Sequence, residues 1–345
     1  MWRIGGIDID GKAVLGPMSG FTSRSYRDFM KPFGASLCFT EMTSDMGVIH
    51  GQSRTRGYIS FSGNHPTGVQ LFGHDPDDIA QAAEKALEIN PEIDLFDINM
   101  GCPVPKVNRS GAGSSLMKDP ELCGRIIRAV KRKVHVPVTA KIRLGWSSSS
   151  INFRDVIEEM TAADVDAITV HARTRDERYA GSPHMDMVEG LQREMSVPLI
   201  ISGNIYLLDD AVEAVRITGA EAVMVARGGV GNPFLLTQID RFFRTGERLR
   251  NPTVSEQIDW CLRFMDMLIE EKGEEKAIRK MRCFAPRFIA GCHKSRMHRN
   301  ELATGITDKG SLISILERIK EELGGEHIYE NAVVVRDDSA DFEEY

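Results

Sequence analysis

A cysteine stands at the end of an expected strand, where it could meet a substrate. Residues 93–100 form a largely apolar run typical of a buried strand, and Gly101, Cys102 and Pro103 follow it. In parallel α/β proteins, ligands bind at the carboxyl ends of the strands, so a thiol held there by a turning glycine and a rigid proline could act on them. Free cysteine is also among the most buried residue types, so Cys102 alone is equally consistent with a packing role.

Strand-like runs alternate with helical patterns along most of the chain. Strands are expected at 13–18, 36–41, 68–73, 93–100, 137–143, 166–171, 198–203 and 222–227, and helices between most of them, for example at 77–89, 120–134, 153–163 and 208–217. Eight such strands fit a (β/α)₈ TIM barrel better than a six-stranded open sheet, and no G-x-G-x-x-G opens the first helix. We therefore predict an α/β chain, with a TIM barrel followed by a smaller all-helical domain.

Polar side chains gather at the far ends of these strands. Because parallel strands end on one rim of a barrel, we expect them to surround a single pocket. They are Met18, Glu41, Gln70, Asn99, Cys102, Lys141, Arg143, His171, Ser202, Asn204 and Arg227. Any one of them could be an ordinary core or rim residue, but eight strands that end alike favour a functional site.

The last two strand ends are typical of a phosphate site. Ser202-Gly203-Asn204 and Ala226-Arg227-Gly228-Gly229 are glycine-rich and precede helices. Strands seven and eight of TIM barrels commonly hold a phosphate with backbone N–H groups and a helix N-terminus, and Arg227 could add a charged donor. A phosphorylated cofactor or substrate is implied.

The same motifs carry a family resemblance across residues 13–235. They are Gly16-Pro17-Met18, 69–73, 97–103, 111–113, 141–146, 171–175 with Tyr179 and Gly181, and 226–233. In this order and spacing the chain resembles the tRNA-dihydrouridine synthases, FMN enzymes that reduce a uridine of tRNA. It differs from the usual family pattern at Gly16, at 202–204 and at Ala226, where the contacts are thought to come largely from backbone amides.

The resemblance implies a division of roles. The reaction needs a hydride at C6 of uracil, from N5 of flavin reduced by NADPH or NADH, and a proton at C5. The Cys102 thiol is the expected acid, since an unperturbed thiol has a pKa near 8.5 and is mostly protonated at neutral pH. Lys141 would place a positive charge beside the N1–C2=O region of the flavin. The expected cofactor-binding residues are Gly16, Pro17, Met18, Gln70, Lys141, His171, Ser202, Gly203, Asn204, Ala226 and Arg227.

Asn99 and Arg143 match the polar edge of a uracil ring, because together they offer an acceptor, a donor and a guanidinium fork. A stacked base inside tRNA cannot reach a barrel pocket, so the enzyme would receive an extruded nucleotide. The expected substrate-binding residues are Asn99, Arg143, Arg173, Arg175, Lys294, Arg296 and Arg299.

The charge distribution is compatible with an RNA partner although the formal net charge is −7. Residues 330–345 hold six acids against one arginine and contribute −5 of that charge. Residues 276–299 hold eight Lys and Arg residues and no acid. Such a run is usually a solvated face. Here it lies where the family has a helical tRNA-binding domain, which favours RNA contact.

Three units are expected along the chain: an FMN-binding barrel at 1–245, a helical tRNA-binding domain at 251–325, and an acidic tail at 326–345 that is partly disordered, with a possible short strand at 332–335. Pro252, Thr253 and Glu256 indicate a linker and a helix start. There is no apolar signal segment or 18-residue apolar run, and the six cysteines form no C-x-x-C pair. We expect a cytoplasmic monomer without metal, disulfides or membrane contact.

Three other classes remain open. An FMN-dependent reductase of a free pyrimidine or related small molecule would share the barrel and the cysteine but would not need the basic segment. A phosphosugar-type barrel enzyme with Lys141 as a Schiff base would leave Cys102 and Gln70 without a role. A non-catalytic RNA-binding relative would have no reason to keep Asn99, Cys102 and Lys141 together.

Overall fold

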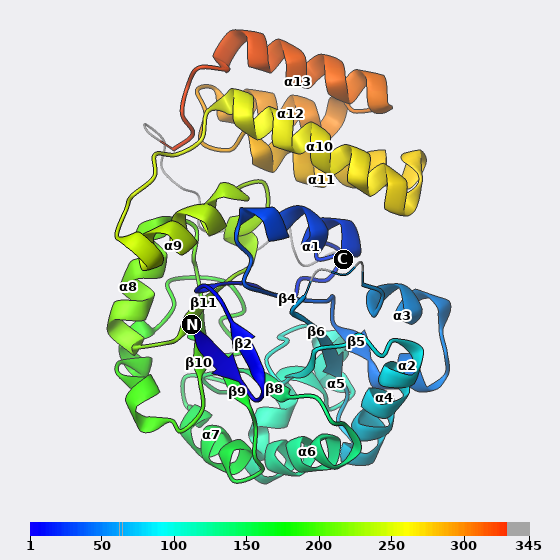
Figure 1. Ribbon diagram of the computed structural model, residues 1–345, viewed down its shortest axis with the longest axis vertical. Coiled ribbons are helices and arrows are strands. Elements are labelled where there is room, and N and C mark those ends of the chain that lie inside the picture. Colours follow the sequence, from blue (N-terminus) through cyan, green and yellow to red (C-terminus); the bar gives the residue numbers. More distant parts are fainter. Residues whose placement is uncertain (62, 64, 330–345) are drawn as a thin grey trace.

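Eight parallel strands close into a barrel with helices around it (Figure 1). The computed structural model describes residues 1–61, 63 and 65–329. The barrel strands are β3 (Ala13–Leu15), β4 (Leu37–Phe39), β6 (Thr67–Phe72), β7 (Leu95–Asn99), β8 (Val138–Arg143), β9 (Ala167–His171), β10 (Leu199–Ser202) and β11 (Ala222–Val225). β4 pairs with both β3 and β6, which closes the ring. The predicted fold class and all eight predicted strands are confirmed, and a two-residue strand, β5 (Thr43–Ser44), extends the pairing of β6.

Helices and 3₁₀ turns connect the strands around the outside of the barrel. The α-helices are α1 (Arg24–Met30), α2 (Asp45–Ile49), α3 (Ser53–Tyr58), α4 (Pro76–Ile89), α5 (Pro105–Arg109), α6 (Pro120–Lys133), α7 (Phe153–Thr161), α8 (Leu208–Thr218) and α9 (Phe234–Thr245). The 3₁₀ turns are η1 (Lys31–Phe33), η2 (Gly113–Lys118), η3 (Met185–Val188), η4 (Leu191–Glu194) and η5 (Arg227–Gly229). Aspartates cap the two longest of these helices: Asp75 accepts from the N–H of Asp77 at 2.9 Å, and Asp119 from that of Leu122 at 2.9 Å.

The barrel interior is apolar at one end and polar at the other. Residues paired across neighbouring strands point to the same side, so the register sorts the interior into layers. Near the amino ends of the strands, Leu95, Ala167, Ile200 and Ala222 belong to one buried apolar cluster. Toward the carboxyl ends, the register pairs polar residues instead: Gln70 with Asp97, Asp97 with Thr139, Asn99 with Lys141, Arg143 with His171, and His171 with Ser202.

An N-terminal hairpin covers the apolar end of the barrel. β1 (Trp2–Ile4) pairs antiparallel with β2 (Ile7–Ile9). Trp2, Ile4 and Ile9 belong to the same buried cluster as the apolar residues near the amino ends of the barrel strands. This end is therefore closed, which leaves the carboxyl rim as the place for a ligand.

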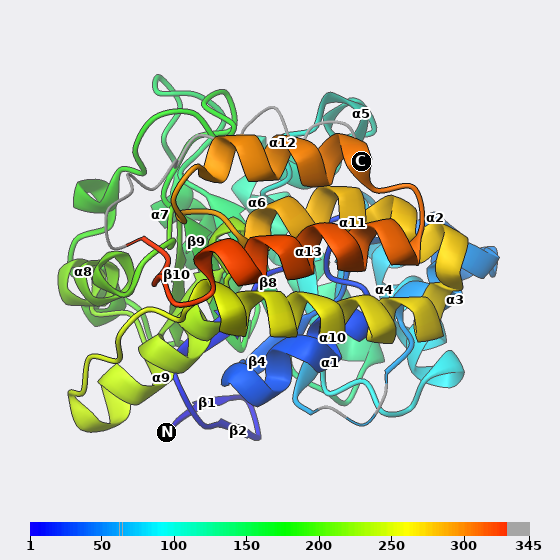
Figure 2. The same cartoon turned by 90° about the horizontal axis from the view of Figure 1, so that it is seen from above.

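A group of helices follows the barrel. α10 (Val254–Lys272), α11 (Glu274–Phe288), α12 (Ser295–Gly305) and α13 (Lys309–Leu323) lie beside one another in Figure 2. The predicted helix start is confirmed for α10: Oγ1 of Thr253 accepts from the N–H of Glu256, and Oε2 of Glu256 accepts from the N–H of Thr253 at 2.8 Å. In Figure 2, α12 lies on the side of α5, which follows Cys102, whereas the β1–β2 hairpin lies on the opposite side.

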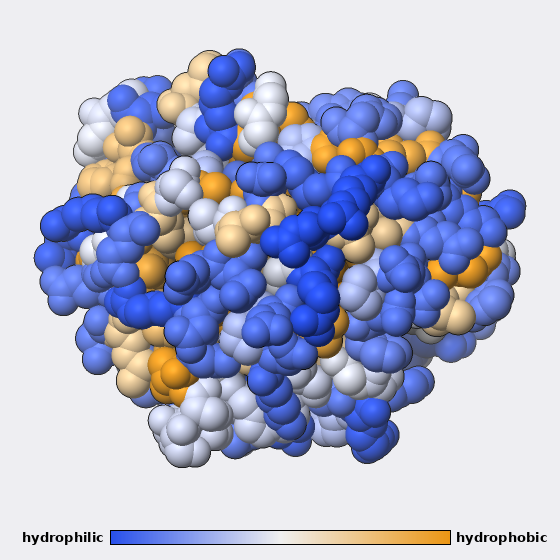
Figure 3. Space-filling model, turned by 90° about the horizontal axis from the view of Figure 1, so that it is seen from below, coloured by the Kyte–Doolittle hydropathy of each residue, from blue (hydrophilic) through white to orange (hydrophobic). Residues whose placement is uncertain are grey.

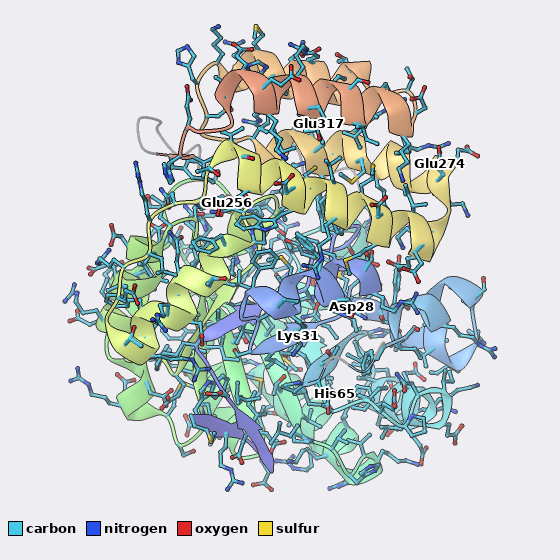
Figure 4. The ribbon with its side chains drawn as sticks, turned by 45° about the horizontal axis from the view of Figure 1, so that its top comes forward. Asp28, Lys31, His65, Glu256, Glu274 and Glu317 are labelled. Atoms are coloured by element: carbon cyan, nitrogen blue, oxygen red, sulfur yellow. The ribbon has the colours of Figure 1, made fainter. Side chains whose placement is uncertain are left out.

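Aromatic side chains join the helical region to the barrel. The ring centroid of Phe264 lies 5.6 Å from that of Tyr26 and 5.2 Å from that of Phe29, and Phe33 packs on Trp260 at 5.0 Å. Each such pair contributes about 0.5–1.5 kcal/mol beyond its buried area. Figure 4 labels Asp28 and Lys31 on the barrel side of this interface and Glu256, Glu274 and Glu317 in the helices above it.

Polar groups surround the aromatic contact. Nζ of Lys280 in α11 donates to the carbonyl of Gly20 at 2.6 Å, and Oε2 of Glu271 in α10 accepts from the N–H of Ser25 at 2.9 Å. Glu41, which follows β4, accepts from the N–H of Gly20. Burial raises the pKa of Glu41, while the charge of Lys280 opposes this shift. The loop after β3 is thus held by both parts of the chain.

The surface opposite the helical region is largely hydrophilic, with apolar residues in small separate groups (Figure 3). In the described part of the chain, no helix is both long and apolar enough to span a bilayer. The same residues contain no group of three or more His, Cys, Asp and Glu side chains arranged to hold a metal ion. The cysteines are free thiols. The strand and the disorder predicted in the acidic tail fall at 330–345, outside the described residues.

Candidate active site

Cys102 lies in the turn that follows β7, at the carboxyl rim. Its side chain is buried with Val107 and Ala112, and Met42 and Phe72 pack against this group. The carbonyl of Cys102 accepts from the N–H of Ser114 at 3.1 Å. At Gly113 the backbone has φ +63°, and a Cβ there would lie 2.9 Å from the carbonyl oxygen of Cys102. Glycine at this position allows the two backbone segments to meet.

A hydrogen-bonded chain leads from the barrel interior to this turn. Nε2 of Gln70 donates to Oδ2 of Asp97 at 2.6 Å, and Nδ2 of Asn99 donates to Oε1 of Gln70 at 2.8 Å. Oδ1 of Asn99 accepts from the backbone N–H groups of Cys102 at 2.9 Å and Gly101 at 3.2 Å. Hydrogen bonds therefore connect the three predicted residues Gln70, Asn99 and Cys102. Asp97 extends this chain of hydrogen bonds into the barrel interior.

Buried charges lie beside the thiol. Burial lowers the pKa of Lys141 to about 8, as does the charge of Arg143, while Asp97 and Cys102 oppose the shift. Burial raises the pKa of Asp97 to about 6 against the hydrogen bonds from Gln70 and Thr139 and the charge of Lys141. Burial also raises the pKa of Cys102, opposed by the Val104 N–H and by the charges of Arg143 and Lys141. At neutral pH the thiol therefore keeps its proton while a cation stands nearby.

Arg143 ties the loop after β7 to the loop after β9. Its Nε donates to the carbonyl of Gly101 at 2.8 Å, and its Nη1 donates to the carbonyls of Thr174 at 2.8 Å and Arg178 at 2.6 Å. The side chain is almost fully buried, and its guanidinium lies 5.4 Å from the ring centroid of Tyr179. Arg143 thus uses two of its three nitrogens to hold the loops after β7 and β9.

His171 is neutral and surrounded by arginines. Burial lowers its pKa well below the usual value, and the charges of Arg143, Lys141, Arg173 and Arg227 act in the same direction. Nη1 of Arg173 donates to Nε2 of His171 at 3.1 Å, which places the imidazole proton on Nδ1. Arg173 is fully buried and also donates to the carbonyls of Ala180 and Gly181.

The turns after β10 and β11 pack against each other and leave one charged donor free. A Cβ at Gly228 would lie 1.9 Å from the carbonyl oxygen of Ile205, so only glycine permits this approach. Nη2 of Arg227 donates to Oδ1 of Asn204 at 3.2 Å. Nη1 of Arg227 is buried and has no hydrogen-bond partner among the described residues. An unpaired buried guanidinium N–H beside the start of η5 fits an anionic group such as a phosphate.

The remaining predicted cofactor residues lie at neighbouring strand ends. Gly16, Pro17 and Met18 follow β3, and the N–H of Gly16 donates to the carbonyl of Val225 at 2.9 Å. Ser202 ends β10, Gly203 has φ +138° and Asn204 has φ +50°. Ala226 separates β11 from η5. These residues lie toward the same end of the barrel as Gln70, Lys141 and His171, and their binding of a cofactor stays a prediction.

Trp146, which follows β8, has two cations on its ring. Nζ of Lys118 lies 3.4 Å from its ring centroid, and the guanidinium of Arg175 lies 4.5 Å from it. Arg175 also pairs with Asp176 at 2.9 Å. Neither Trp146 nor Lys118 was predicted to be functional, although the tryptophan belongs to the motif at 141–146.

Lys294, Arg296 and Arg299 lie apart from this cluster, at the start of α12 and within it. Nζ of Lys294 pairs with Oε1 of Glu322 at 3.2 Å, and Arg296 is exposed. Other cations of the basic run serve the fold: Lys280 binds the barrel loop, and Arg282 donates to the carbonyl of Ile306 at 2.8 Å. The basic run is therefore divided between packing contacts in α11 and a more exposed set around α12.

A family model and two named relatives match this chain over most of its length and agree with each other. The family model described as Dihydrouridine synthase (Dus) matches residues 14–323. tRNA-dihydrouridine synthase B of Pasteurella multocida is 31% identical over 318 residues, covering 91% of this chain and 94% of the relative. The protein of the same name from Pseudomonas aeruginosa is 33% identical over 304 residues, covering 87% and 91%.

A more distant likeness concerns the fold alone. Histamine dehydrogenase from Rhizobium sp. 4-9 superposes with a TM-score of 0.54 at 14% sequence identity, covering 97% of this chain and 66% of that one.

Proposed function

The chain belongs to the dihydrouridine synthase family, and on this premise we propose that it reduces a uridine of tRNA to 5,6-dihydrouridine. The observation that carries the proposal is the buried thiol of Cys102, which the Asn99 amide holds at the barrel rim beside Lys141. A protonated thiol at that place suits the transfer of a proton to carbon.

FMN is the proposed cofactor, because the rim offers a place for its phosphate. Arg227 and the first backbone N–H groups of η5 would hold the phosphate, with Ser202, Gly203, Asn204 and Ala226 around it. Gly16, Pro17, Met18, Gln70, Lys141 and His171 would contact the ring system. When bound, FMN reduced by NADPH or NADH supplies the hydride that adds to C6 of uracil.

Protein groups supply the remaining steps. Cys102 gives its proton to C5, and its raised pKa keeps that proton in place until the hydride arrives. Lys141 would place a positive charge beside the bound cofactor. Asn99 would hold the uracil edge with its second amide hydrogen, in place of its long contact with Sδ of Met42 at 3.9 Å. Arg143 would contribute Nη2, the nitrogen that donates to none of these loop carbonyls. Neutral His171 would lie against the cofactor or the base.

The helical region is the proposed second contact with tRNA. Lys294, Arg296 and Arg299 belong to the helix on the rim side of the molecule, so phosphates beside the extruded uridine could reach them (Figure 2). Arg175 would contact the tRNA at the rim itself, whereas Arg173, which is fully buried, would contribute by holding His171. We propose 1–245 as the catalytic domain, 251–325 as the tRNA-binding domain, 326–345 as an appended tail, and a cytoplasmic monomer as the working form.

Analysis of cellular tRNA tests this function. Nucleoside mass spectrometry of tRNA from cells with and without the protein should show one mapped dihydrouridine that disappears with the gene and returns with the wild-type chain, but not with Cys102→Ala. Unchanged dihydrouridine at every position in the deleted strain would exclude the proposal for cellular tRNA. A purified protein that instead reduces free uracil or uridine would favour the small-molecule reductase.

A further inference from the structure

The side-chain amides of Gln70 and Asn99 form a hydrogen-bonded chain whose direction is fixed at both ends. At the rim, backbone N–H groups of Gly101 and Cys102 can only donate, so Asn99 must turn its oxygen toward them. Nδ2 of Asn99 then faces Oε1 of Gln70 at 2.8 Å, and Nε2 of Gln70 faces Asp97 at 2.6 Å. The side chain at position 97 must therefore accept a hydrogen bond from Gln70.

Asp97 meets that requirement. Its Oδ2 accepts from Gln70, and its Oδ1 accepts from Oγ1 of Thr139 at 2.7 Å. Asp97 is fully buried and Gln70 is 1% exposed, so bulk water does not compete for these bonds. An ionised carboxylate is an acceptor only, which leaves a single arrangement of both amides. With a pKa of about 6, Asp97 is mostly ionised at neutral pH.

Resting on the function proposed above, we propose that Asp97 is a positioning residue for Cys102. Its carboxylate sets the direction of the amide chain through Gln70 and Asn99, and the chain holds the turn that carries the thiol. Asp97 touches neither the substrate nor the thiol in this role.

The opposite direction of the amide chain would leave backbone donors in the Cys102 turn without an acceptor. A donor at position 97 would turn Gln70 so that its oxygen faced inward and its NH₂ faced Asn99. Asn99 would then accept from Gln70 and present its own NH₂ to the N–H groups of Gly101 and Cys102. Two sets of donors would meet, and a buried unpaired N–H destabilises the turn that holds the thiol.

Moving the charge along the chain tests the proposal. Asn99→Asp places carboxylates on both sides of Gln70, which can donate to only one of them. Adding Asp97→Asn removes this conflict, because the Gln70 amide can then turn by half a rotation. The new amide at position 97 donates to Oε1 of Gln70, and Nε2 of Gln70 donates to the new carboxylate at position 99. The second oxygen of that aspartate still accepts from Cys102 N–H.

Two measurements report on the stability of the protein and on the accessibility of Cys102, and neither needs tRNA or catalytic turnover. One is the thermal midpoint, and the other is the rate at which iodoacetamide alkylates Cys102, read from its peptide by mass spectrometry. Asn99→Asp should lower the midpoint by about 4–8 °C and speed alkylation about tenfold or more. The double variant should recover to within about 2 °C and about threefold of wild type.

Single and control variants separate direction from simple stability. Asp97→Asn alone can still turn an oxygen toward Gln70, so alkylation should change less than about threefold. Ile98→Val, in the same strand, should lower the midpoint without speeding alkylation, since it removes a methyl group from the core and leaves the amide chain intact.

Two outcomes would overturn the proposal: a double variant as impaired as the two single variants combined, or Asn99→Asp indistinguishable from wild type in both measurements. A wild-type protein that forms no dihydrouridine would defeat the proposed function without altering these results, so the two failures are distinguishable.

Discussion

Replacing Arg227 with methionine tests the phosphate site, because methionine keeps an apolar stem but donates no hydrogen bond. Nη1 of Arg227 is buried without a partner among the described residues, and Nη2 holds Oδ1 of Asn204 at 3.2 Å. A phosphate at this place gains a charge-assisted hydrogen bond from Nη1, which contributes about 1.5–3 kcal/mol. Because about 1.4 kcal/mol is tenfold in Kd, Arg227→Met should weaken FMN binding by about 10- to 150-fold.

The assay is a titration of FMN-free protein with FMN, followed by flavin fluorescence. Riboflavin, which lacks the phosphate, supplies the second arm: its affinity should be nearly equal for wild type and Arg227→Met. Arg216→Met is the matched control, since Arg216 is exposed and pairs with Glu213 in α8. Arg227 does not hold the phosphate if Arg227→Met weakens FMN binding no more than Arg216→Met does, or if it weakens riboflavin binding as much as FMN binding.

Three further predictions concern the thiol, the basic helix and the glycine turn. Cys102→Ala should retain FMN, tRNA affinity and flavin reduction by NADPH, yet slow flavin reoxidation by tRNA about 10²–10⁴-fold in stopped-flow traces; a rate near wild type would show that another group is the acid. Changing Lys294, Arg296 and Arg299 together to Glu should weaken tRNA binding and reduce its log–log salt slope by about one per lost phosphate contact; an unchanged affinity at moderate salt would mean a solvated face. Gly228→Ala should lower the free energy of unfolding by about 1–3 kcal/mol in urea, because its Cβ would strike the backbone of the preceding turn, and an unaltered midpoint would contradict that packing.

The barrel was predictable because its signals are local. Each strand reads as a short apolar run, and polar residues stand at or near the end of such a run, as Arg143 does in β8 and His171 in β9. The start of α10 was also predictable, since Thr253 and Glu256 form a capping box within four residues. The N-terminal hairpin was missed although Gly5-Gly6 between two isoleucines is a recognisable two-residue turn signal.

The finer geometry was not predictable, because it depends on partners far apart in the sequence. Arg143 meets carbonyls at Gly101, Thr174 and Arg178, which belong to loops that the pairing of β7, β8 and β9 brings together. Lys280 looked like part of an RNA-binding run, but it donates to Gly20 across the interface. The position of Asp97 was informative, because an acid inside an apolar strand needs a buried hydrogen-bond partner. Gln70 and Thr139 are those partners.

An anaerobic single-turnover experiment tests the proposed reaction most directly. Protein loaded with FMN is reduced, freed of excess reductant and mixed with unmodified tRNA transcript, while flavin absorbance and tRNA nucleosides are followed together. The proposal predicts that the flavin reoxidises as one dihydrouridine appears per flavin oxidised, whereas free uridine at the same concentration leaves the flavin reduced. Flavin that stays reduced in the presence of tRNA, or a protein that cannot take up FMN at all, would contradict it.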